Sequence, residues 1–175
     1  MTVTAVQTSY GFPSVAAFAG MLADAPYPPD VATMRNDEAS AEIAFGRAVK
    51  FGSTTDRQSA KLPDSENAVI AGIAVHGHHY SPDMDLGTVG LKPTTVFGAL
   101  RRGRIWVVSE DGNNVGDRGW VRGVAAGDPE FLGGIANADD STDTVNTTNQ
   151  IVFLTSATAG QLAIVEVDFT NKPGI

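Results

Sequence analysis

The amino-acid sequence predicts an all-β fold, a small barrel or sandwich of short and mostly antiparallel strands. The chain has 175 residues, and its 19 glycines and 9 prolines are spread along it and divide it into short segments. Several segments have the length and residue types of strands, and no long amphipathic helix pattern occurs. We expect a single β-rich domain over residues 31–175, preceded by an extended or partly helical N-terminal arm over residues 1–30.

The expected arm is small, apolar and interrupted by prolines. Val15, Phe18 and Leu22 have the spacing of a helix face that Ser14 could cap, whereas the prolines equally favour an extended chain. The arm either packs on its own domain or lies on a neighbouring subunit, because exposed apolar segments need a partner. Four large side chains of the arm are candidate interface anchors: Phe12, Phe18, Met21 and Tyr27.

The strand-like segments begin at residue 41. Residues 41–49 alternate loosely and are broken at Gly46, as at a bulge or bend. Residues 68–75 form a continuous apolar run, which predicts a strand buried on both faces at the centre of the sheet. The polar stretches 52–66 and 76–93 are predicted to be loops.

Three further strands are expected between residues 94 and 122. Residues 94–97 and 104–108 are strand-like and are predicted to be joined by a turn at Gly103, and residues 120–122 complete a hairpin with a long loop. Residues 137–150 are almost wholly polar and predict a mobile loop.

The two final strands carry the clearest pattern. Residues 151–154 form one strand, and residues 162–169 form the other after Gly160. In the last strand apolar and acidic side chains alternate, which is the pattern of a half-buried strand. Trp106 and Trp120 are expected in the core, with sugar stacking as the alternative.

Composition excludes several classes of function. A net charge of −8 repels phosphate backbones, so we expect no nucleic-acid partner. No apolar run is long enough to span a membrane, and the N-terminus lacks the basic start of a signal peptide. Without cysteine the chain has neither disulfides nor thiolate chemistry, as suits a protein made in a reducing cytoplasm.

The three histidines of the chain, at positions 76, 78 and 79, lie together and precede two aspartates. His76 and His78 would share a strand face and could ligate a transition metal, which leaves a metal-dependent, cupin-like β-barrel enzyme as an alternative. The cupin pattern also needs a downstream histidine, and none remains. We therefore expect no metal, no cofactor and no catalytic residue, and interpret this segment as a polar strand end or subunit contact.

One basic cluster occurs, beside aromatic residues at a strand entry. Its members are Arg101, Arg102 and Arg104. In so acidic a chain they are expected to pair with carboxylates, within the chain or on another subunit, because the guanidinium suits bidentate pairing. They are therefore the second group of candidate interface residues.

In their order along the chain, several short segments resemble the cement, or decoration, proteins of tailed-bacteriophage capsids. The segments are Gly20–Asp24 with the following prolines, Ile43–Val49, Val69–Val75, Arg102–Val107, Val115–Asp117 and Leu162–Val167.

This resemblance implies a non-catalytic structural protein of the virion, bound to the outer face of a phage head, which stabilises contacts between major capsid protein subunits. It also implies homo-oligomers, dimers or trimers, at capsid symmetry axes. A structural protein of the tail or baseplate, or a glycan-binding module on a particle surface, is the alternative.

Overall fold

A computed structural model of the chain describes residues 17–23, 28–77, 90–124 and 131–170, and these residues contain strands and no helix. The predicted all-β class is therefore confirmed. The strands in chain order are β1 (Asp30–Asn36), β2 (Ile43–Ala44), β3 (Ala48–Phe51), β4 (Ser59–Lys61), β5 (Ile70–Ala74), β6 (Gly90–Leu91), β7 (Val96–Val108), β8 (Trp120–Arg122), β9 (Ile135–Ala136), β10 (Thr144–Val145), β11 (Ile151–Phe153) and β12 (Leu162–Asp168).

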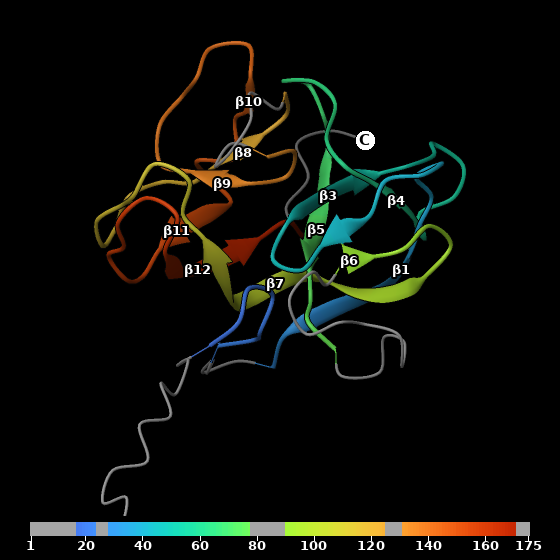
Figure 1. The fold of residues 1–175 in the computed structure, drawn as a ribbon, viewed down its shortest axis with the longest axis horizontal. Coiled ribbons are helices and arrows are strands. Elements are labelled where there is room, and N and C mark those ends of the chain that lie inside the picture. Colours follow the sequence, from blue (N-terminus) through green and yellow to red (C-terminus); the bar gives the residue numbers. More distant parts are fainter. Residues whose placement is uncertain (1–16, 24–27, 78–89, 125–130, 171–175) are drawn as a thin grey trace, which may run out of the picture.

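Five strands close into a small barrel. The order β1-β4-β3-β5-β7 is completed by antiparallel pairing of β1 with β7, so the sheet returns to its first strand (Figure 1). All of these pairings are antiparallel except that of β1 with β4. Closure leaves these strands without a free sheet edge.

Strand β7 extends beyond the barrel. Its first half pairs with β1 and β5, and its second half pairs with β12, which in turn pairs with β11. A three-stranded sheet, β10-β8-β9, covers this extension (Figure 1). Gly103 lies where the two halves meet and has φ 138°, a conformation that favours glycine. The predicted turn at Gly103 is thus wrong, because the glycine bends one continuous strand.

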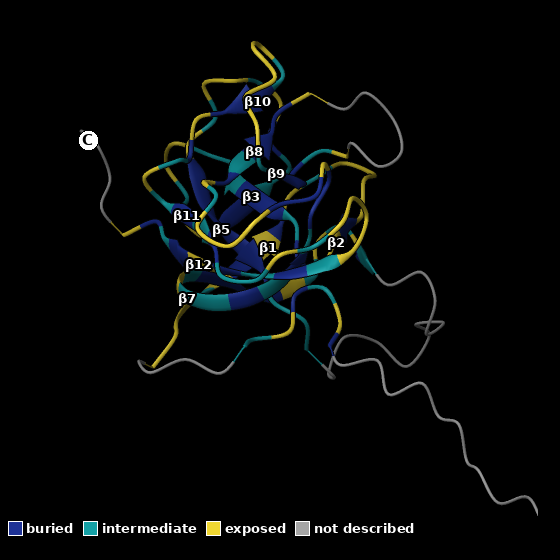
Figure 2. Ribbon diagram, turned by 90° about the vertical axis from the view of Figure 1, so that its left-hand side faces the viewer, coloured by how far each residue is buried: buried dark blue, intermediate teal, exposed yellow. Residues whose placement is uncertain are grey.

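Two hydrophobic cores lie on opposite faces of the barrel wall, and buried residues fill the middle of the molecule in Figure 2. One core is inside the barrel and combines alanines with larger side chains such as Met34 and Phe97. The other lies under the three-stranded sheet and contains Phe153 and Phe169. All five residues of β5 are buried because the strand separates the two cores. The prediction of a central, doubly buried strand is confirmed.

Some segments expected to be loops contain strands. Strand β4 lies within 52–66 and β6 within 76–93, and β10 lies within 137–150 with Thr144 buried. The predicted hairpin of 120–122 with 104–108 is also wrong, since β8 pairs with β9 and β10. These strands have two or three residues, too few for a periodic pattern.

The final pair of strands follows the prediction. β11 and β12 are antiparallel, and Val165 and Val167 are buried while Glu166 is exposed. Gly160, before β12, has φ 77°. The break predicted at Gly46 is also present, between β2 and β3, with φ 78°.

One buried amide ties the end of β1 to its surroundings. Asn36 has no exposed surface, and its Nδ2 donates to the carbonyl oxygens of Ala41 at 3.1 Å and Leu91 at 2.7 Å. Its Oδ1 accepts a hydrogen bond from the backbone N–H of Glu38 at 2.9 Å. Every polar atom of the side chain is therefore used, as burial requires.

Candidate interaction surface

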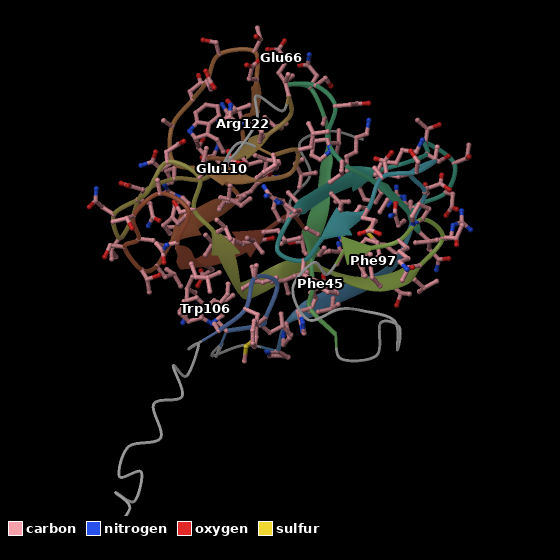
Figure 3. The ribbon with its side chains drawn as sticks, viewed as in Figure 1. Phe45, Glu66, Phe97, Trp106, Glu110 and Arg122 are labelled. Carbon is pink, nitrogen blue, oxygen red and sulfur yellow. The ribbon has the colours of Figure 1, made fainter. Side chains whose placement is uncertain are left out.

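The outward face of β7 and β12 carries large apolar side chains. Trp106 pairs with Ile164, and Val108 pairs with Leu162, while the residues between them point into the core. These four side chains are half-buried. In Figure 3 Trp106 lies at the margin of the molecule, away from Glu110 and Arg122. We call this surface the Trp106 face; it comprises Met21, Arg104, Trp106, Val108, Leu162, Ile164 and Glu166.

Residues 20–23 border the Trp106 face and run beside β7 as an extended segment with one isolated bridge. Gly20 N–H donates to Trp106 O at 2.7 Å, Trp106 N–H to Met21 O at 2.9 Å, and Ala23 N–H to Arg104 O at 2.9 Å. Leu22 forms a bridge with Ile105 and packs against the core, whereas Met21 is 44% exposed. This part of the N-terminal segment therefore lies on its own domain, without helix.

Phe18 also remains largely exposed although its ring has a neighbour. It is 58% exposed, and its ring centroid lies 6.0 Å from that of His76, nearly parallel to it. His76 is in turn 4.7 Å from Phe45, and its backbone N–H donates to Gly20 O at 2.7 Å. His76 thus holds the N-terminal segment against the barrel.

The three arginines face carboxylates of the same chain. Arg104 Nε lies 2.8 Å from Glu166 Oε2, and Arg102 Nε lies 3.8 Å from Asp168 Oδ2. Arg101 Nη1 lies 3.8 Å from Asp30 Oδ2. All six side chains are at least 32% exposed, so these pairs are screened by water and contribute little to stability.

The structure brings together part of the predicted interface set. Met21 and Arg104 both belong to the Trp106 face, and Phe18 lies in the same N-terminal segment as Met21. Arg101 is paired with β1 instead. Phe12 and Tyr27 lie outside the described residues.

Trp106 and its partner Ile164 were not among the interface residues predicted from the sequence. The expectation that both tryptophans lie in the core is wrong, because Trp106 and Trp120 are only half-buried.

The histidine segment offers no described metal site. His76 lies between aromatic rings, and His78, His79 and the two following aspartates lie outside the described residues. Within the described ranges, no three His, Asp or Glu side chains are grouped so that they could hold a metal ion. No helix able to cross a membrane occurs in the same ranges.

A network of buried charged side chains lies in the interior, where β8 lies near the end of β7 and the start of β3. Glu110 Oε2 lies 3.1 Å from Arg122 Nε, and Glu110 Oε1 lies 3.5 Å from Arg47 Nη1. Glu110 Oε1 also accepts a hydrogen bond from the backbone N–H of Phe131 at 3.1 Å, and Arg122 Nη1 donates to Asp140 Oδ2 at 2.6 Å. Figure 3 shows Glu110 and Arg122 close together.

Burial dominates the electrostatics of this network. It raises the pKa of Glu110, and the hydrogen bonds from Arg122 and Phe131 oppose that shift. Burial likewise lowers the pKa of Arg47, and the Glu110 carboxylate opposes it. The polar stretch 137–150, which contains Asp140, thus supplies one carboxylate to a buried guanidinium.

Comparison with known proteins gives one family. The model of the family described as structural cement protein (E217 gp24/Pam3 gp6) matches residues 6–168, which is most of the chain. No curated protein matches the sequence.

The matches among solved structures include two chains, of which the first is similar in fold. A chain of "The capsid of Myoviridae Phage XM1" has a TM-score of 0.64 and 17% identity, with 96% of this chain and 97% of that chain covered. A chain of "The crystal structure of head fiber gp8.5 N base in bacteriophage phi29" has a TM-score of 0.48 and 13% identity, with 84% of this chain and 100% of that chain covered.

Proposed function

This chain belongs to the structural cement protein family of bacteriophages, and from that premise we propose that it binds the outer surface of a phage head and stabilises contacts between major capsid protein subunits. Its role is structural, in the virion, in association with capsid proteins. We place its synthesis in the host cytoplasm, before attachment, and assign it no catalytic residue, metal or cofactor.

The Trp106 face is the observation that carries this proposal. An indole, a thioether and three aliphatic side chains stand on one sheet face, next to the Arg104–Glu166 pair. Aromatic residues, Met and Arg are enriched where proteins bind each other. A sheet face is also rigid, so it loses little conformational entropy when a partner covers it.

Phe18 and Met21 extend the proposed contact into the N-terminal segment, and Phe12 and Tyr27 are proposed as further anchors of a 1–30 arm. Arg101, Arg102 and Arg104 are the proposed charged contacts, because each exposed pair could exchange its carboxylate for one of a neighbour. The single domain over 31–175 would assemble as a dimer or trimer at a capsid symmetry axis, and so contact several capsid subunits at once.

Binding to isolated heads tests the proposal. Heads stripped of cement protein are mixed with the purified protein and separated on a density gradient, and their DNA release is followed on heating. We expect a fixed ratio to the major capsid protein and a higher release temperature. Trp106→Ser should weaken attachment about tenfold or more, as for a central interface residue. A wild-type protein that never sediments with heads would refute the proposal.

A further inference from the structure

A second concave surface lies between the β3–β4 connection and the segment before β5. The pocket has a volume of about 480 Å³ and is lined by residues from 50–57 and 64–69. Its lining is mixed: Ser53 and Asn67 contribute polar groups, and Phe51, Ala68 and Val69 supply an apolar wall. None of these residues belongs to the Trp106 face.

The pocket is locally positive on an acidic protein. Lys50 Nζ pairs with Asp64 Oδ2 at 2.5 Å, and Lys61 also lies near enough to lower the pKa of Asp64, although the bond from Lys50 is the main cause. Arg57 is exposed and forms no ion pair with the described part of the chain. Its neighbour Asp56 faces Arg35 instead, at 3.7 Å. One guanidinium on this rim is therefore open to a carboxylate.

The apolar wall is also uncovered. Val69 is 58% exposed although it directly precedes the fully buried strand β5. An exposed valine and an arginine with no ion pair among the described residues line the same pocket, and together they offer the two contacts that an acidic peptide with an apolar side chain would make. On this acidic protein, Arg101, Arg102 and Arg104 already face carboxylates of the chain, whereas Arg57 offers a carboxylate a guanidinium with no ion pair to displace among the described residues.

We propose that this pocket is a second protein-binding site, which takes an acidic segment of a partner protein with its carboxylate on Arg57 and an apolar side chain on Val69. That the partner is a capsid protein rests on the proposed function. The preference of the pocket for an acidic segment with an apolar side chain rests on the pocket residues alone.

The two surfaces lie on different sides of the molecule. In Figure 3 Glu66, which stands between the pocket residues Ser65 and Asn67, is at the top, and Trp106 is at the lower left. A protein with two separated sites can bridge two partner segments, and linkage of the two contacts raises the overall affinity well above either one.

A labelled peptide in which aspartate alternates with leucine is the probe, titrated into the full-length protein by fluorescence anisotropy. We expect the wild type to bind it, and Arg57→Glu and Val69→Ser each to weaken binding about tenfold, the usual size for loss of a well-placed contact. Versions of the peptide with lysine for aspartate, or serine for leucine, should not bind. Lys92→Glu, the same charge reversal at an exposed site outside the pocket, is the matched control and should bind as the wild type does.

Absence of binding to the acidic peptide by the wild type, or equal losses in Arg57→Glu and Lys92→Glu, would overturn the pocket assignment. The head-binding measurement is separate. If heads are bound and the peptide is not, the pocket proposal alone fails; if the peptide is bound and heads are not, the proposed function fails and the pocket stands.

Discussion

Glu110 and Arg122 form an ion pair in the interior, 3.1 Å apart, with side chains that are 1% and 2% exposed. Such a pair gives little net stability, because desolvation of both charges offsets their attraction. It does fix position: Glu110 follows β7 closely, Arg122 ends β8, and Arg47 precedes β3. The pair therefore specifies how the three-stranded sheet sits on the barrel.

Removal of the cation should be costly. In Arg122→Leu the partners of the Glu110 carboxylate among the described residues are reduced to Arg47 and the backbone N–H of Phe131, so we expect a loss of about 3–5 kcal/mol in the free energy of unfolding near neutral pH. Chemical denaturation measures it. Arg118→Leu, which removes an exposed arginine, should change stability by less than about 0.5 kcal/mol.

The same variant should respond to pH in a defined direction. Burial already raises the pKa of Glu110 in the folded state, and loss of Arg122 removes the main opposing interaction. A raised folded-state pKa gives stability that is present below the unfolded-state pKa and lost as pH rises through the folded-state pKa. The deficit of Arg122→Leu should thus shrink on acidification. A deficit that is constant with pH would mean that Glu110 is not the titrating group.

Gly134 should not tolerate a side chain. A Cβ there would overlap Oε1 of Glu110 and crowd Nη1 of Arg47, so Gly134→Ala should cost more than about 2 kcal/mol, as overpacking does. Gly160 has a positive φ but nothing within 4 Å of a Cβ, so Gly160→Ala should cost only about 1 kcal/mol of backbone strain. Equal shifts in thermal midpoint would contradict the proposed crowding.

Asn36→Asp should destabilise the end of β1. The new side chain cannot donate to both carbonyl oxygens that Asn36 now serves, and it brings a charge into the core. We expect a loss of about 3 kcal/mol. Asn67→Asp makes the same change at an exposed position and should leave the urea midpoint nearly unchanged.

Two adjacent residues should separate binding from stability. Leu22 packs on the core, so Leu22→Ser should lower the free energy of unfolding by about 1–2 kcal/mol. Met21 faces outward, so Met21→Ser should keep the wild-type stability and reduce attachment to heads several-fold. If the two variants behave alike in both assays, Met21 is not an interface residue.

Strands β5 and β12 could be predicted from the sequence. Burial on both faces of β5 gives a continuous apolar run, and burial on one face of β12 gives alternating apolar and polar residues. Strand β1 was missed: only Met34 and Asn36 are fully buried, and one of them is polar. A turn was predicted at Gly103, whereas the residue lies within β7. A glycine indicates that a positive φ is possible, but it does not distinguish a turn from a bend within a strand.

The candidate site was predicted only in part. Met21 and Arg104 stood out by their surroundings in sequence, but Trp106 could not be placed, since which face of β7 is covered depends on the distant β12 and on residues 20–23. The buried charge network could not be predicted from the sequence either, because Arg47, Glu110 and Arg122 are far apart along the chain.

Strand β7 belongs to both halves of the molecule, with register to β1 at one end and to β12 at the other. A force on the Trp106 face, directed along β7, acts parallel to the strand on its hydrogen bonds to β1 and to β12. These hydrogen bonds must then break together rather than one after another. The protein would then resist tension best in one direction, and the orientation of β7 on the shell would decide which strain it withstands.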